Sequence, residues 1–281
     1  MSKTKRLLLC TTIVLALLAT VLTGCEKELK EVVINSPEDL KGLTVGCQVA
    51  TTAHESCEEF LKTIDFTLKT YDQIIQTFTD LKTGRLDAVV VDEVVARYYV
   101  MQEPESYMIT GSKLTNEPIG VCFKKSNTAM RDTVNAIIDK FQKDGTLKEL
   151  SEKWFGEDLT ENLEKTAVSE TKIDKTPFEG KTVLKIGVDD VYPPMEYKND
   201  KNETVGFDID LAKAIGKELG LKVEFVSTAW DGIFTSLNTD KYDAIISSIS
   251  INDERQQNFA LTKPYVNNAQ VIVVRAPKDK K

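Results

Sequence analysis

The fold of this chain is decided by the stretch Ile186-Gly-Val-Asp-Asp-Val-Tyr-Pro-Pro-Met-Glu-Tyr197, in its second half. The apolar residues at 183–188 predict a strand, and residues 208–219 have the apolar spacing of an amphipathic helix that ends at Gly220. A second strand is predicted at 222–226. Strands and helices that alternate in this way form mostly parallel sheets, which bind ligands beyond the carboxyl ends of their strands. The turn after the first strand is therefore a candidate ligand site.

The first half of the chain repeats this order of elements. Strands are predicted at 43–48 and 86–91, and Thr52-Ala-His-Glu55 is a capping box that opens a helix between them. Residues 71–90 also resemble residues 230–246, since both begin with an aromatic residue and Asp and end with Asp-Ala and two apolar residues. The repetition predicts two similar α/β lobes that face each other across a cleft.

Two further motifs connect this pattern to a known family. They are Val205-Gly-Phe-Asp-Ile-Asp-Leu211 and Asp243-Ala-Ile-Ile-Ser-Ser-Ile-Ser-Ile-Asn-Asp-Glu-Arg255. With the stretch quoted first, they resemble the bacterial extracytoplasmic solute-binding proteins of the polar-amino-acid ABC transporter type. The resemblance implies a two-lobed, periplasmic-binding-protein-like (type II) α/β fold. Residues 144–156 match a segment that follows these motifs in the family, but here they precede them. The chain therefore looks like a circular permutant.

The permuted order sets the expected domain boundaries. They are a lipoprotein signal peptide at 1–24, a lipidated tether and hinge strand at 25–35, a smaller lobe at 36–121, a larger lobe at 122–156 and 183–276, and a linker at 157–182 that joins the family's usual ends. Permutation is expected to leave one covalent crossing between the lobes, near 121–123. The halves of the opened crossing, 32–35 and 271–275, could still pair as strands, and the hinge without ligand is expected to be looser than in unpermuted relatives.

The beginning of the chain predicts secretion. Lys3, Lys5 and Arg6 precede an apolar run at 7–22 that is short for a membrane span. The next residues complete Leu22-Thr-Gly-Cys25, which resembles the lipoprotein signal box, so that Cys25 is expected to be lipidated after cleavage. The protein is then expected outside the cytoplasm, anchored to the cell membrane by its N-terminal lipid. An uncleaved anchor helix is the alternative.

Composition excludes some classes of partner. The formal net charge is -8, and loss of the three cations of the leader takes it to about -11. Such an acidic chain is not expected to bind nucleic acid. Beyond Cys25 the cysteines are Cys47, Cys57 and Cys122, an odd number that leaves at least one free thiol, and buried apolar thiols are the favoured interpretation. No motif for a metal or a cofactor is present, and a monomer is expected.

A receptor for a free amino acid needs a fixed cation for the carboxylate and an acid for the ammonium group. Arg255 is the candidate cation, because a guanidinium fork holds a carboxylate well. By resemblance, Thr52 and Ser250 donate to the same carboxylate, Asp92 accepts from the ammonium group, and Ser248 offers its backbone carbonyl. The alternatives are a solvated helix charge for Arg255 and a helix N-cap for Asp92.

The rest of the resemblance concerns the side chain of the ligand. Tyr192 and Trp230 match the two aromatic positions that enclose it in the family, although both could be ordinary packing residues. Asp189 lies where some members contact its far end, and Gln48 is neutral where some glutamine receptors have a lysine. Ala50 replaces the usual glycine of the family's Gly-Thr turn. We expect a polar or cationic ligand, with arginine or a relative favoured.

The function implied by the resemblance is capture of an amino acid for the permease of an ABC importer, with no catalytic residues. Two alternatives remain, a lipid-anchored amino-acid sensor and a dehydratase-like enzyme on the same fold. His54, the only histidine, stands beside Glu55 without a nucleophile motif, which gives a catalytic triad little support. Glu196 and Asp231 could be imagined as paired acids, but both lie in motifs that are structural in the family.

Overall fold

The structure of the protein is a computed structural model that describes residues 31–161, 163 and 173–277. The chain from Val32 onward forms one compact unit. The predicted signal peptide, the lipidation site Cys25 and most of the central linker, residues 162 and 164–172, lie outside the described residues.

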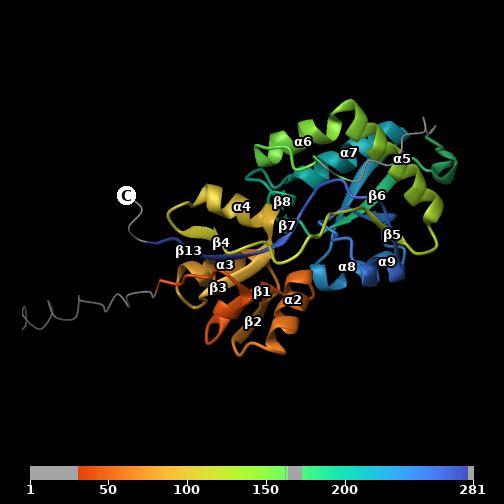
Figure 1. Cartoon of the computed structure of the whole chain (residues 1–281). Helices are drawn as coiled ribbons and strands as arrows, with labels where there is room; N and C mark the ends of the chain where they lie inside the picture. The colour runs from red at the N-terminus through yellow and green to blue at the C-terminus, as the bar shows by residue number, and fades with distance from the viewer. Residues whose placement is uncertain (1–30, 162, 164–172, 278–281) are drawn as a thin grey trace, which may run out of the picture. The chain divides into compact units, whose positions relative to one another are not determined.

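The first lobe is built on a sheet with the strand order β2-β1-β3-β13-β4 (Figure 1). Its elements are η1 (Pro37–Leu40), β1 (Thr44–Gln48), α2 (Thr52–Leu61), β2 (Thr67–Tyr71), α3 (Ile74–Lys82), β3 (Ala88–Asp92), α4 (Glu93–Gln102), β4 (Tyr107–Thr110) and β13 (Gln270–Arg275). Alternate residues of β3 face opposite sides of the sheet. Ala88 and Val90 pack in one apolar cluster with α2, whereas Val89 and Val91 pack with α3 and α4 in another. Helices therefore cover both faces.

The second lobe has a sheet with the order β10-β6-β11-β5-β12. Its elements are β5 (Cys122–Lys124), α5 (Thr128–Asp144), α6 (Thr146–Phe155), η2 (Thr176–Phe178), β6 (Val183–Val188), α7 (Phe207–Leu219), β10 (Lys222–Ser227), η3 (Trp230–Gly232), α8 (Ile233–Asn238), β11 (Ala244–Ile245), α9 (Asp253–Asn258) and β12 (Phe259–Leu261). A small antiparallel sheet joins β7 (Val191–Tyr192), β8 (Glu196–Lys198) and β9 (Thr204–Val205).

The two main sheets share one topology. In each, three parallel strands are followed by a strand that is antiparallel to both of its neighbours, β13 in the first lobe and β5 in the second. The prediction of two similar α/β lobes is confirmed.

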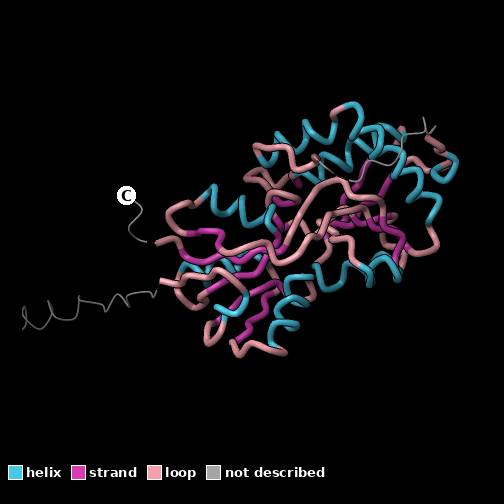
Figure 2. Tube along the Cα trace, in the orientation of Figure 1, coloured by secondary structure: helices cyan, strands magenta, loops and turns pink. Residues whose placement is uncertain are grey.

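The chain passes between the lobes twice. One connection runs from β4 to β5 through residues 111–121, and the other runs from β12 to β13 through residues 262–269, both as loops (Figures 1 and 2). The two connections pair through an antiparallel bridge between Ile119 and Val266, where the Ile119 amide donates to the Val266 carbonyl at 3.0 Å. We expected a single covalent crossing, and this expectation was wrong.

The described chain both begins and ends in the first lobe, so the point at which the family's order is interrupted lies within this lobe. Residues 32–35 are not a strand, and β13 pairs with β3 and β4 instead of with them. Strand β13 thus belongs to the first sheet, although we had placed residues 183–276 together. The hydroxyl of Thr110 in β4 donates to the Ile34 carbonyl at 2.7 Å, so this segment lies beside the same edge strand. With both crossings intact, the reason to expect a looser hinge is gone.

Candidate ligand-binding site

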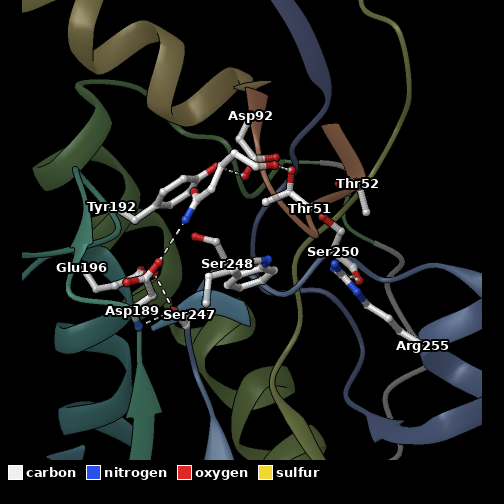
Figure 3. A pocket seen from close by; sticks show the side chains of 12 residues that line it. Thr51, Thr52, Asp92, Asp189, Tyr192, Glu196, Ser247, Ser248, Ser250 and Arg255 are labelled. Carbon is white, nitrogen blue, oxygen red and sulfur yellow. Dashed lines mark hydrogen bonds between the residues drawn. The ribbon is translucent and has the colours of Figure 1, made fainter. Parts of the chain in front are cut away.

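A cavity of about 310 Å³ lies between the two lobes (Figure 3). The first lobe lines it with Gln48, Thr51, Thr52 and Asp92, and the second lobe with Asp189, Tyr192, Glu196, Trp230, Ser247, Ser248, Ser250 and Arg255. All eight residues that we expected to bind the ligand are among them.

The sheets place these residues at one edge. Gln48 and Asp92 end the parallel strands β1 and β3 of the first sheet, and Asp189 directly follows β6 of the second. Ser247 lies two residues past β11, which is parallel to β6. Because the carboxyl ends of parallel strands meet at the same edge, both lobes present their polar side chains to the cavity.

Arg255 is a buried cation. It is 7 % exposed, and its guanidinium lies 5.7 Å from the centre of the Trp230 ring and 5.4 Å from that of Phe234. Its Nη1 donates to the Ser250 carbonyl at 3.1 Å, and no carboxylate of the described residues is within 4.0 Å of it. Burial lowers its pKa, but an arginine stays charged at neutral pH. The guanidinium therefore has donors left for an anion, and the solvated-charge interpretation is wrong.

The backbone amide of Arg255 is not available to a ligand. The amide of Arg255 already donates to Oδ1 of Asn252, the N-cap of α9, at 2.8 Å. The guanidinium, rather than this amide, is the group available to a ligand.

Asp92 accepts three hydrogen bonds in the cavity wall. Its donors are the Tyr192 hydroxyl at 2.5 Å, Asn268 Nδ2 at 2.6 Å and Gln270 Nε2 at 2.7 Å. Burial raises the pKa of Asp92, and the three hydrogen bonds oppose this rise. Its side chain makes no capping bond to α4, although it stands at the N-cap position. The capping alternative is therefore not observed.

Asp189 lies at another part of the wall. Its Oδ2 accepts from Gln48 Nε2 at 3.2 Å, and its amide donates to the Ser247 hydroxyl at 2.9 Å. Burial raises the pKa of Asp189 to about 6, while the bond from Gln48 acts in the opposite direction. Asp189 can therefore exchange its proton close to neutral pH.

Three hydrogen bonds join the lobes around the cavity. Besides the bonds from Tyr192 to Asp92 and from Gln48 to Asp189, Trp230 Nε1 donates to the Ala50 carbonyl at 2.8 Å. Both aromatic residues that we expected to enclose the ligand therefore also hold the two lobes together. Ala50 itself has a φ of 57°, a left-handed conformation that favours glycine.

Sequence reasoning missed four lining residues as binding candidates. Gln48 had been weighed only as a neutral position and Glu196 only as a catalytic acid, while Thr51 and Ser247 had not been given a role. Thr51, not Thr52, is the N-cap of α2, where its hydroxyl accepts from the His54 amide at 3.2 Å. The Ser-Ser-Ile-Ser sequence contained Ser247, and its three serines all line the cavity.

Of the two acids and the histidine that were considered for catalysis, only Glu196 lines the cavity. Glu196 lies against Asp208 rather than Asp231, which does not line the cavity. His54 is also outside the lining, and its Nδ1 accepts from the Ala50 amide at 3.3 Å.

The described cysteines are all buried and free; they are Cys47, Cys57 and Cys122. Within the described ranges, no group of three or more His, Cys, Asp and Glu residues could hold a metal ion. A search of the same ranges finds no helix with the length and apolar character needed to cross a membrane.

Comparison with curated proteins gives partial matches. The chain is 37% identical over 134 residues to the L-cystine-binding protein TcyJ of Escherichia coli K12, a match that covers 48% of this chain and 50% of that protein. It is 41% identical over 92 residues to the arginine-binding protein 1 of an ABC transporter of the same organism, covering 33% and 38%. The matches thus span half or less of the length of these relatives.

Among solved structures, an ancestral amino acid-binding protein, a precursor of cyclohexadienyl dehydratase, is 49% identical over 27% of this chain and 34% of its own, with a TM-score of 0.27. A family model, in contrast, matches most of this chain, namely residues 31–157 and 184–280. Its description is bacterial extracellular solute-binding proteins, family 3. The chain therefore belongs to the bacterial extracellular solute-binding proteins of family 3.

Proposed function

We propose that this protein captures a free amino acid between its two lobes and delivers it to an ABC importer. The observation that carries the proposal is the pair Arg255 and Asp92, two buried ionisable groups of opposite charge that line one cavity from different lobes without forming an ion pair with each other. A free amino acid carries the two complementary charges on groups attached to the same carbon atom. The relatives, whose names state cystine and arginine as ligands, support the same class.

The head group of the ligand fits the polar groups around this pair. The Arg255 guanidinium takes the carboxylate, with Thr52 and Ser250 as further donors from the two sides of the cavity. Asp92 accepts from the ammonium group, together with Ser248, whose buried hydroxyl has no hydrogen-bond partner within the described structure. Each charge-assisted hydrogen bond contributes about 1.5 to 3 kcal/mol. Contacts from both lobes favour the closed state, so capture and closure are coupled.

The side chain of the ligand meets acids and aromatic rings. Tyr192 and Trp230 offer flat faces, and Asp189 and Glu196 add carboxyl groups to a cavity that contains no lysine and no other cation than Arg255 among its lining residues. Rings and acids together favour a cationic side chain. We therefore propose arginine or a similar amino acid as the ligand.

The proposal extends to the protein's place and chain order. It is anchored outside the cytoplasm by a lipid on Cys25, acts as a monomer, and is a circular permutant whose usual ends are joined by residues 157–182. In support of the joining segment, the family model leaves out residues 158–183. Both ends of the opened connection lie beside β4, because Ile34 bonds to Thr110 and the Ala276 amide donates to the Ser106 carbonyl at 3.0 Å.

We propose binding without chemistry. The lining residues include no histidine, cysteine or lysine. The Ser247 hydroxyl donates to the Glu196 carboxyl group and also accepts from the Asp189 amide, so it bridges two wall residues rather than standing as a free nucleophile beside a general base.

Calorimetric titration of the purified full chain, kept in mild detergent, tests the proposal. The panel is L-arginine, L-lysine, L-histidine, L-glutamine and L-cystine. Removing the two or more bonds of the guanidinium in Arg255→Ala should weaken binding by at least about 100-fold. Arg85→Ala is the matched control, because Arg85 is 63% exposed on the first lobe and pairs with Asp80. Absence of binding to every member of the panel would refute an amino-acid receptor, and equal loss in both variants would remove Arg255 from the site.

Delivery is tested separately in cells. Deletion of the gene should reduce uptake of the radiolabelled ligand, and the Cys25→Ala variant should restore uptake less well than the wild type. Unchanged uptake after deletion would favour a sensor over an importer component.

A further inference from the structure

Two acids lie buried against each other under the wall of the cavity. Glu196 of β8 is 1% exposed and Asp208, in the first turn of α7, is fully buried. Gly206 lets the start of α7 lie close to the backbone that precedes Glu196, because a Cβ at Gly206 would lie 2.1 Å from the Met195 carbonyl oxygen. No lysine, arginine or histidine of the described residues is within 4.0 Å of either carboxyl group. The charge of the pair is therefore not balanced by a neighbouring cation.

The two acids hold the turn that carries the cavity serines. Asp208 Oδ2 accepts from the Ser248 amide at 2.7 Å, and Oδ1 accepts from the Tyr265 hydroxyl at 2.8 Å. Glu196 Oε1 accepts from the Ser247 hydroxyl at 2.7 Å, and this hydroxyl in turn accepts from the Asp189 amide. Figure 3 shows Glu196, Asp189 and Ser247 together at one side of the cavity.

The turn needs such support. Ser248 has a φ of 51°, in the left-handed region that residues other than glycine enter only at a cost. The hydrogen bond from the Ser248 amide to Asp208 holds this conformation, and the bond from the Ser247 hydroxyl to Glu196 holds the preceding residue. A change in either acid therefore acts directly on two residues that line the cavity.

One proton resolves the contact between the acids. Both oxygens of Asp208 accept hydrogen bonds, whereas Glu196 accepts one at Oε1 only. Glu196 Oε2 is therefore buried without a donor. Two adjacent buried carboxylates repel each other, whereas an acid and a carboxylate form a hydrogen bond. Burial and the neighbouring Asp208 raise the pKa of Glu196 well above its usual value. The pKa of Asp208 is raised less, to about 6, because its hydrogen bonds favour the charged form.

We propose that Glu196 is a protonated positioning residue that shares its proton with Asp208 and thereby holds Ser247 and Ser248 in the ligand-binding conformation, so that loss of this proton in alkali weakens ligand capture. The inference rests on the proposed function and deepens it. The titratable groups that face the pair are Asp189 directly after β6, Tyr192 on β7 and Tyr265 in the second crossing, and each of them adds negative charge when it ionises. None of them can replace the missing proton with a positive charge.

The test compares dissociation constants at different pH values. Wild-type full chain, Glu196→Gln and Glu224→Gln are titrated with L-arginine, L-histidine and L-cystine from about pH 6 to about pH 10. Glutamine keeps a donor toward Asp208 and an acceptor for Ser247, but it cannot ionise. Glu224 is exposed on β10 and gives the same change of charge away from the cavity.

We expect the wild type and Glu224→Gln to lose affinity in alkali by up to about tenfold for each pH unit above the pKa of Glu196 in the free protein. Glu196→Gln should lose only the affinity that deprotonation of the ligand's own ammonium group removes. This holds whatever the affinity of the variant is at neutral pH. Parallel profiles for all three proteins would overturn the proposal.

A second measurement does not depend on a ligand. The infrared spectrum of the wild type minus that of Glu196→Gln at neutral pH should contain the carbonyl band of a protonated carboxylic acid, and the band should disappear in alkali. If no amino acid binds to the wild type, the proposed function fails, but this band still shows whether Glu196 is protonated. Absence of the band would overturn the shared proton even if ligand binding is normal.

Discussion

The hydroxyl of Tyr192, on the second lobe, donates a hydrogen bond of 2.5 Å to the carboxylate of Asp92, on the first. The bond links a residue expected to contact the ligand's side chain with the residue expected to accept its ammonium group. It can exist only when the lobes are closed, since the two residues belong to different sheets. Closure therefore completes the hydrogen bonding of Asp92 as well as enclosing the ligand.

Removal of this hydroxyl should weaken ligand binding. In Tyr192→Phe, Asp92 loses one of its three donors while the aromatic face is kept, and a buried charged acceptor without a donor costs about 1 to 3 kcal/mol. The dissociation constant for L-arginine should rise by about tenfold or more, as measured by calorimetry. Tyr71→Phe is the control, because Tyr71 donates to Asp80 at 2.8 Å within the first lobe. An equal change in both variants would contradict a specific role for the bond between lobes.

Binding of a cationic ligand should depend on the proton of Asp189. The pKa of Asp189 is raised to about 6 by burial, so that below this pH the free protein must release a proton before it can pair with a cation. Affinity for L-arginine should therefore be constant above about pH 6 and fall by up to about tenfold per pH unit below it. Calorimetry at several pH values measures this dependence.

Two comparisons isolate the effect of Asp189. The Asp189→Asn variant should bind arginine more weakly and without this loss in acid. Citrulline has the shape of arginine but a neutral side chain, so its binding to the wild type should also show no loss of affinity in acid. An acid-dependent loss that persists in Asp189→Asn would assign the proton to another group.

The cysteines should be inert in the folded protein. Cys47, Cys57 and Cys122 are buried. A hydrogen bond with Cys47, together with burial, raises the pKa of Cys57, and burial raises the pKa of Cys122, so that neither forms the reactive thiolate. Iodoacetamide should label none of the three in the native protein and all three after unfolding in urea, as mass spectrometry of peptides shows. Labelling of Cys57 in the native state would mean that α2 opens from the sheet far more readily than its burial suggests.

The sequence predicted which residues line the cavity better than it predicted the connections between the lobes. Arg255, Asp92 and the aromatic pair were found because each lies in a local motif, at a strand end or a helix start, that can be recognised within a few residues. The run at 271–274 is apolar on both faces, as a central strand requires, but such a run does not specify its neighbours. Its place between β3 and β4 depends on pairings with residues about 160 to 190 positions away in the sequence.

The role of Glu196 was missed for a related reason. Its partner Ser247 is 51 residues away, and Asp208 belongs to another element, helix α7. A carboxyl group in a sequence indicates solvent exposure unless its partners are known, because most acids lie at the surface. Hydrogen-bond networks between distant segments are visible only once the fold has brought those segments together.

The paired crossings should make the hinge sensitive to a single methyl group. A Cβ at Gly120 would lie 2.9 Å from Ile251 Cδ1 and 3.2 Å from the Thr262 carbonyl oxygen, which belongs to the other crossing. Gly120→Ala should therefore lower the free energy of unfolding by about 1 to 3 kcal/mol, the usual cost of overpacking. Gly232→Ala, where a Cβ meets nothing within 4 Å, is the control and should change stability by less than about 1 kcal/mol. Urea denaturation measures both.

The same variant should also separate the crossings from closure. The Gly120 amide donates to the Ile249 carbonyl at 2.9 Å. Ile249 lies in the turn at 247–250 that carries the cavity serines, so displacement of this crossing moves the turn as well. Small-angle scattering of Gly120→Ala with saturating L-arginine should give a larger radius of gyration than that of the wild type, because the lobes close less completely. Without ligand the two proteins should differ less, since two intact covalent crossings already limit opening. Loss of stability with unchanged closure would mean that the crossings only connect the lobes and do not position the turn.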